Sequence, residues 1–111
     1  MRKIEQAMCA AIKMHKSMKC GNTEVECGRT LFGDYKKVVV RLHGNEIFKW
    51  NEAEDIAEFT LAGWNTPTTR SRLRALGIDV RTKEHTPMYD GRAIKSSVWY
   101  EHNKRNWRDA L

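Results

Sequence analysis

Apolar side chains recur at helical spacing near the start of the chain, at Ile4, Met8, Ala11, Ile12 and Met18. Residues three, four, seven and eight positions apart lie on one face of an α-helix, and the lysines of this segment fall mostly outside that stripe. Gly21 is suited to the left-handed residue that follows a helix. The pattern predicts a helix over residues 2–19 whose apolar stripe covers one face of a sheet.

A period of two replaces the helical spacing from Thr23 onward, where Val25 and Cys27 alternate with glutamates. This alternation is typical of a half-buried β-strand. Residues 51–62 show no such clear period, because a helix-like start is not followed by a sustained helical stripe. Periodicity alone leaves their secondary structure open.

Two apolar runs flank the segment Leu42-His43-Gly44-Asn45. The first run, residues 35–43, holds three consecutive valines and therefore suits a central strand. Gly44-Asn45 is a Gly-x dipeptide of the kind that forms a type II′ turn between antiparallel strands. The chain is thus predicted to turn at these two residues and to return as a strand over residues 46–50.

A second helix carries signals at both of its ends. Thr66 can cap its first turn, and Pro67 suits its first position. Gly77 follows its last residue, as is common at helix C-termini. These signals predict a helix over residues 67–76.

The face of this helix that packs on the core is predicted from the helical spacing to hold Thr69, Leu73 and Leu76. Arg70 and Arg74 lie on the opposite side together with Ser71, and Arg72 lies on the far flank. We expect the helix to dock through its leucines and to expose its guanidinium groups.

The last third of the chain alternates again around Ile78 and Val80 and over residues 98–100. Asp90-Gly91 is a strong turn signal, which predicts a second hairpin with strands of about five residues on either side. Trp107 lies in a polar tail, and we expect its apolar ring to fold back onto the sheet.

These elements together predict an α+β fold in a single domain, residues 1–111. Its N-terminal helix packs on a mainly antiparallel, twisted sheet of about five to six strands, and the second short helix covers about 67–76.

Composition supports a packed core, since the 111 residues are 41% hydrophobic and 31% charged. No apolar run approaches the roughly 20 residues of a membrane span, and the amino terminus lacks the apolar region of a signal peptide. We therefore expect a cytoplasmic location and no membrane partner.

Cysteines and histidines give no sign of a metal site. Cys9, Cys20 and Cys27 cannot all pair internally, and neither they nor the four histidines have the spacing of zinc ligands. The odd number of cysteines fits a reducing compartment. The sequence predicts no metal and no cofactor.

Positive charge is concentrated in the second half of the chain. The formal net charge is +6, and residues 70–108 hold ten Lys and Arg against four Asp and Glu, whereas residues 1–69 hold ten against nine. Such asymmetry is typical of proteins that meet phosphates, because basic side chains displace counterions from a polyanion. A basic face that only aids solubility is the alternative explanation.

Several segments together resemble a family of small tailed-phage proteins. They are Gly21-Asn22-Thr23-x-Val25, the run from Val40 to Ile47 with its Leu-His-Gly-Asn hairpin, the block from Ala62 to Leu76 with Gly-Trp-x-Thr-x-Thr-Thr-Arg-Ser-Arg-Leu, and Val98-Trp99-Tyr100. The resemblance spans roughly residues 2–100 and implies that residues 56–62 form a strand. The chain departs from the family at residues 103–107, where members tend to have a Gly-Lys-Pro-Trp turn. Members are mostly uncharacterised accessory proteins, so the resemblance implies a location in the host cytoplasm but no chemistry.

Catalytic constellations are missing from the sequence. Neither the serines nor the cysteines sit in the context of an activated nucleophile, and the chain has no Gly-rich phosphate loop and no HExxH motif. A nuclease site built from Asp79, Lys83 and Glu84 is less economical than a strand with alternating surface charges. The sequence therefore predicts a protein that is not an enzyme and has no small-molecule substrate.

The preferred hypothesis is binding of nucleic acid, DNA or RNA, with weak sequence selectivity. The side chains assigned to this binding are Trp64, Thr68, Arg70, Arg72, Arg74, Arg81, Lys83, Arg92 and Lys95. The alternative is a host-takeover or anti-defence inhibitor that binds a host protein through the same side chains, since Trp and Arg are enriched at interface hot spots.

Overall fold

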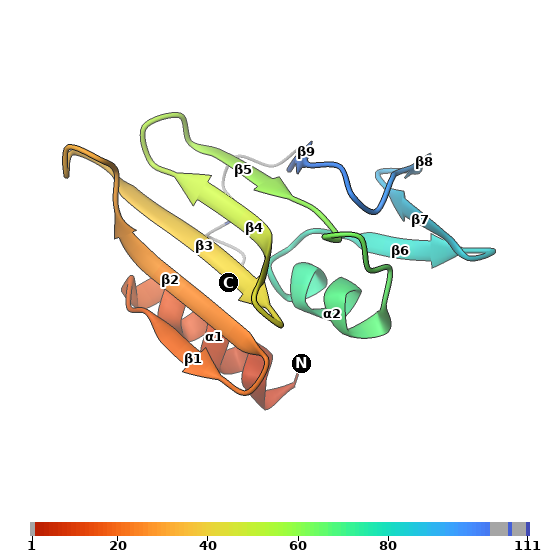
Figure 1. Cartoon of the computed structure of the whole chain (residues 1–111), viewed down its shortest axis with the longest axis horizontal. Helices are drawn as coiled ribbons and strands as arrows, with labels where there is room; N and C mark the ends of the chain where they lie inside the picture. The colour runs from red at the N-terminus through yellow and green to blue at the C-terminus, as the bar shows by residue number, and fades with distance from the viewer. Residues whose placement is uncertain (1, 103–106, 108–110) are drawn as a thin grey trace.

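Two helices pack on one face of a six-stranded antiparallel sheet, as Figure 1 shows. The structure is a computed structural model and describes residues 2–102, 107 and 111. The helices are α1 (Lys3–Met14) and α2 (Pro67–Ala75). The predicted α+β class is confirmed, with the N-terminal helix and the short second helix on the sheet.

The larger sheet follows the chain order closely. Its strands are, in spatial order, β1 (Met18–Cys20), β2 (Thr23–Arg29), β3 (Lys36–Leu42), β4 (Asn45–Asn51), β5 (Ile56–Phe59) and β9 (Tyr100–Glu101). The valine-rich strand β3 is central, as predicted, because it pairs with β2 on one side and β4 on the other. The strand implied for residues 56–62 is present as β5 but ends at Phe59, three residues earlier than implied.

A second, smaller sheet was not predicted from the sequence. It contains β6 (Val80–Lys83), β7 (Thr86–Tyr89) and β8 (Arg92–Ala93), all antiparallel. The predicted turn at Asp90-Gly91 joins β7 to β8, but the strands on either side have four and two residues, fewer than the roughly five predicted. Pro87 lies inside β7, opposite Thr82. Figure 1 shows this sheet beyond α2, at one end of the molecule.

Helix α1 ends earlier than predicted. His15 takes the left-handed conformation that was assigned to Gly21, with φ 51°, and its ring Nε2 lies 3.0 Å from the carbonyl oxygen of Gly28. Gly21, with φ 56°, serves the turn between β1 and β2. The contact with β2 thus supports the end of α1 at His15, a residue other than glycine. Because α1 ends early, the residues before the turn at Gly21 form an additional strand, β1, that was not predicted.

The hairpin between β3 and β4 turns one residue earlier than predicted. Leu42 pairs with Asn45, so His43 and Gly44 are the turn residues, with φ values of 52° and 81°. Two consecutive positive φ angles define a type I′ turn in place of the predicted type II′. The pairing register shifts between Val40 and Arg41, and as a result Ile47 and Phe48 are both buried.

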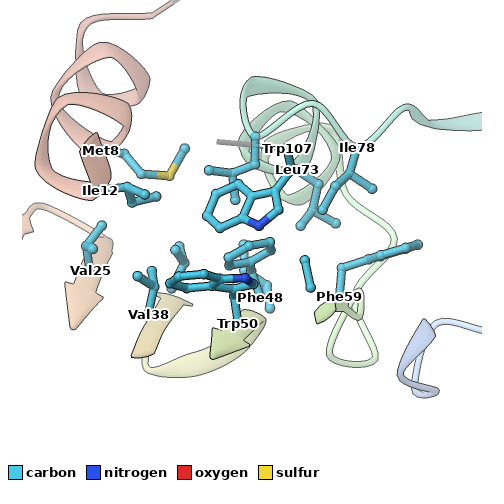
Figure 2. Close-up of a cluster of buried hydrophobic side chains, with 14 of the residues drawn as sticks. Met8, Ile12, Val25, Val38, Phe48, Trp50, Phe59, Leu73, Ile78 and Trp107 are labelled. Atoms are coloured by element: carbon cyan, nitrogen blue, oxygen red, sulfur yellow. The ribbon is translucent and has the colours of Figure 1, made fainter. Parts of the chain in front are cut away.

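The hydrophobic core lies between the helices and the larger sheet. Figure 2 shows Met8 and Ile12 of α1 and Leu73 of α2 above the strands. Trp107 lies among them, with its ring centroid 4.8 Å from that of Phe48 and 5.8 Å from that of Trp50, both edge-on. The expectation that Trp107 folds back onto the sheet is confirmed.

Candidate functional site

Helix α2 begins as its sequence predicts. The Thr66 hydroxyl oxygen accepts a hydrogen bond of 3.1 Å from the backbone N–H of Thr69, and Pro67 is the first helical residue. Leu73 and Leu76 are fully buried. The helix therefore docks through the predicted face, and its N-terminal end meets the loop that carries Trp64.

Arg72 does not lie on the surface, which corrects the prediction that it displays its guanidinium group. Its Nη1 lies 2.7 Å from Glu5 Oε2, and its Nε donates a 3.0 Å hydrogen bond to the Thr23 hydroxyl. Both members of the ion pair are only 4% exposed in their side chains. Arg72 joins α2 to α1 and β2 and cannot contact a ligand in this fold.

Glu5 is the centre of this buried cluster. Burial alone would raise the pKa of its carboxyl group, but the hydrogen bonds from Ser71 and Arg72 and the charge of Arg72 together lower that pKa below its ordinary value. Glu5 is therefore held as a carboxylate that accepts hydrogen bonds from two residues of α2. The cluster fixes the orientation of the helix that also carries Thr68, Arg70 and Arg74.

Arg70 and Arg74 lie on the flank of α2 that faces β6. Arg70 Nη1 donates a 2.6 Å hydrogen bond to Asn65 Oδ1, and Arg74 Nη1 donates a 3.1 Å bond to the carbonyl oxygen of Val80. Arg74 is exposed and Arg70 is half-buried. Neither has a carboxylate partner within the described residues, so both positive charges remain available to an anion.

The other basic candidates surround the small sheet. Arg81 and Lys83 are exposed on one face of β6, whereas Arg92 pairs with Tyr89, which shares the opposite face with buried Val80. Arg81 forms an exposed ion pair of 2.8 Å with Asp79. Lys95, also exposed, follows β8. The structure thus distributes these cations over both faces of the small sheet and does not gather them into one patch.

Trp64 lies at the mouth of a pocket that the sequence did not predict. Its side chain is 63% exposed, and the pocket beside it has a volume of about 410 Å³. The pocket is lined by Leu42, His43, Asn45, Ile47, Leu61, Ala62, Trp64, Thr66, Thr68 and Thr69. Thr68 therefore faces this pocket, on the flank of α2 away from Arg74.

No local sequence pattern could have predicted this pocket, because its walls come from two separate segments of the chain. The turn between β3 and β4 brings residues 42–47 against residues 61–69. The shift of register in β4, which turns Ile47 inward, supplies part of the wall. The exposed Gly63-Trp64 dipeptide was the one local signal for a site here.

The described part of the chain offers no group of three or more His, Cys, Asp or Glu side chains arranged to hold a metal ion. No helix within it has both the length and the apolar composition needed to cross a membrane. What the arrangement provides chemically is an open indole ring, a pocket of mixed polarity and a set of exposed cations.

Comparisons with known proteins assign the chain to a protein family. No curated protein and no solved structure matches it. The family model described as "Kyanoviridae Gp96 protein" matches residues 1–108, almost the whole length. This agrees with the resemblance to phage proteins that the hairpin and α2 motifs indicated, and the chain belongs to the Kyanoviridae Gp96 family of phage proteins.

Proposed function

We propose that this phage protein binds nucleic acid in the host cytoplasm and performs no catalysis. The binding residues are Trp64 and a set of cations that extends over α2 and both faces of the small sheet. We call these cations the basic surface, and they are Arg70, Arg74, Arg81, Lys83, Arg92 and Lys95. The observation that carries the proposal is that five of these six cations are exposed, and that within the described residues only Arg81 has a carboxylate partner. Cations without acidic partners attract phosphates most strongly.

The arrangement of the basic surface favours weak sequence selectivity. Its side chains come from α2, from both faces of the small sheet and from the segment after β8. Contacts spread in this way suit a phosphate backbone, whereas base recognition needs several side chains that converge in one groove.

Fluorescence anisotropy with labelled oligonucleotides tests the proposal. Replacing Lys83, Arg92 and Lys95 by alanine should weaken binding at low salt by at least tenfold. The matched control replaces Lys13 of α1, Lys16 of the segment between α1 and β1, and Lys19 of β1, all exposed, and removes the same three charges. Because the two variants have equal net charge, a difference between them reports the position of the cations.

The affinity of the unaltered protein should also fall steeply with salt, since each phosphate contact releases counterions. An affinity that does not change between about 50 and 200 mM salt would contradict the proposal. Equal losses in the two triple variants would contradict the assignment to the basic surface.

Binding to a host protein is the second candidate function, and a different surface favours it. Leu31 and Phe32, at the tip of the β2–β3 hairpin, are 91% and 84% exposed, and Tyr35 next to them is also exposed. Figure 1 shows this tip at the end of the sheet away from α2. Apolar side chains presented in this way are typical of protein contacts.

Capture from host lysate, with and without nuclease, separates the two functions. A protein inhibitor should retain one stoichiometric partner after nuclease treatment and lose it when Leu31 and Phe32 are both changed to serine. A nucleic-acid binder should lose its captured proteins to the nuclease and be unaffected by those changes.

A further inference from the structure

We infer that the pocket beside Trp64 receives one unpaired base of a single-stranded nucleic acid, with Trp64 as the stacking platform and Arg70 as the contact for the adjoining phosphate. This inference rests on the proposed function and names its substrate class. It assigns Trp64 and the pocket a role distinct from that of the basic surface, which would attract any polyanion.

Of the four tryptophans, Trp64 is the one whose ring is open to a ligand. Trp50 and Trp107 are buried in the core. Trp99 is half-buried, and Lys49 Nζ lies 4.3 Å from its ring centroid. A base can therefore stack on Trp64 without displacing any contact of the core.

The walls of the pocket combine apolar groups, which suit the faces of a base, with hydrogen-bonding groups, which suit its edge. Leu42, Ile47 and Leu61 supply an aliphatic wall for the faces of an aromatic ring. Asn45 and Thr68 add an amide and a hydroxyl, which can donate to or accept from the polar edge of a base. The volume of about 410 Å³ lies within the range of small-ligand sites.

Positive charge for an anionic group comes from beside the pocket, because the described residues that line it include no Lys or Arg. The described residues that line it include no Asp or Glu. Asn65, the neighbour of Trp64, accepts a 2.6 Å hydrogen bond from Arg70 and so holds that guanidinium beside the indole loop. A guanidinium has five N–H donors, and this bond uses one of them, so Arg70 retains donors for a phosphate.

A base in a duplex cannot reach such a pocket without leaving its stack, which costs free energy. The pocket should therefore distinguish strands by pairing state, while the basic surface binds both. Preference for single strands is the functional signature of this site.

The experiment compares three oligomers of equal charge with the unaltered protein and with Trp64→Ala. The oligomers are single-stranded oligothymidylate, an abasic strand of the same length, and a duplex with the same number of phosphates. The unaltered protein should bind the thymidylate more tightly than the other two. Trp64→Ala should weaken thymidylate binding by about 5- to 150-fold, the range for one base–aromatic stack, and leave abasic binding unchanged.

Trp64→Phe is the matched control, because phenylalanine keeps a stacking face and should keep most of the affinity. Since Trp64 is largely exposed, both variants should melt like the unaltered protein. Thymidylate should also quench part of the tryptophan emission, and Trp64→Phe should lose that quenching.

The outcomes separate the inference from the proposed function. Equal, salt-dependent binding of all three oligomers, unaffected by Trp64→Ala, would overturn the inference and leave the proposed function standing. Absence of binding to every oligomer at low salt would overturn both. Loss of a captured host protein in Trp64→Ala, with thymidylate binding unchanged, would assign the pocket to a protein side chain and overturn the inference.

Discussion

Arg72 and Arg74 stand two positions apart in α2 and have opposite environments. The guanidinium of Arg72 is buried against Glu5, whereas Arg74 is exposed and, among the residues that the structure describes, its side chain bonds to a backbone oxygen only. Helical spacing placed Arg72 on the flank of the helix but could not show that α1 carries a carboxylate at that point. The flank of α2 that carries Arg72 becomes buried only when α1 packs against it.

Removing one member of the buried pair should be far costlier than removing an exposed arginine. Arg72→Met should lower the free energy of unfolding by about 3–5 kcal/mol, because it leaves the Glu5 carboxylate buried without its countercharge. Arg74→Met should cost about 1 kcal/mol or less, the worth of one hydrogen bond. Urea unfolding followed by tryptophan fluorescence measures both losses.

The control for this comparison replaces both charged residues, Glu5→Met with Arg72→Met. An apolar pair of similar volume should recover most of the stability, since it removes two desolvated charges together. Equal losses in Arg72→Met and Arg74→Met would show that the pair is solvated and that Arg72 could after all reach a ligand.

The stability of the folded protein at low pH depends on the ionisation of the same Glu5 carboxylate. The pKa of Glu5 is lowered in the folded protein from its ordinary value of 4.5. The unfolded chain therefore binds a proton at Glu5 more readily than the folded protein does. The ionised carboxylate contributes its full stabilisation of the fold above about pH 4.5, and this contribution is lost as the pH falls through the lower pKa of the folded state.

Glu5→Gln should consequently flatten the acid limb of the stability curve. The unaltered protein should lose free energy of unfolding below about pH 4.5 with a contribution of up to 1.4 kcal/mol per pH unit from this one site, and the variant should lack that contribution. Urea midpoints between pH 6 and pH 3 test this. Parallel curves for the two proteins would show that Glu5 has an ordinary pKa.

At the scale of the elements, the sequence was most informative where the signal is local. Thr66, Pro67 and Gly77 placed both ends of α2, because caps and proline act within one turn. The sequence was least informative where contact with another element determines the structure. At the end of α1, for example, His15 contacts the backbone of Gly28 in β2. The three-stranded sheet has strands of two to four residues, too short to produce a clear period.

The β3–β4 turn provides a test at this scale. Gly44 has φ 81°, in the left-handed region, and nothing lies within 4 Å of a Cβ built there. Gly44→Ala should therefore destabilise the protein through backbone strain alone, by about 1–2 kcal/mol. Thermal or urea unfolding gives the value.

Gly28→Ala is the matched control in the same sheet. Its backbone lies outside the left-handed region, and the new Cβ would meet Lys37 at an ordinary 3.5 Å. We expect this change to be neutral or stabilising by up to about 1 kcal/mol, because alanine loses less entropy than glycine in a strand. A loss at Gly28 as large as that at Gly44 would contradict the assignment of strain to the turn.

At the scale of the whole molecule, the sequence showed the surplus of positive charge but not its distribution. Counting charges along the chain treated the cations of residues 70–95 as one group, yet the fold buries Arg72 and puts Arg81 and Arg92 on different faces of the small sheet. The pocket beside Trp64 depends on contacts between segments some twenty residues apart. Both features arise only when the elements pack.

Salt dependence tests whether the exposed cations act through position or through net charge alone. For single strands, the slope of log affinity against log salt is about −0.7 for each phosphate neutralised, so Arg74→Gln should reduce its magnitude by about 0.7. Arg41→Gln removes the same charge from a guanidinium already held between glutamates, 2.9 Å from Glu26, and should leave the slope unchanged. Anisotropy titrations of oligothymidylate at four salt concentrations measure both slopes. If the two variants lost slope equally, the ligand would be sensing the total charge of the protein, and the surface formed by α2 and the small sheet would have no special part in binding.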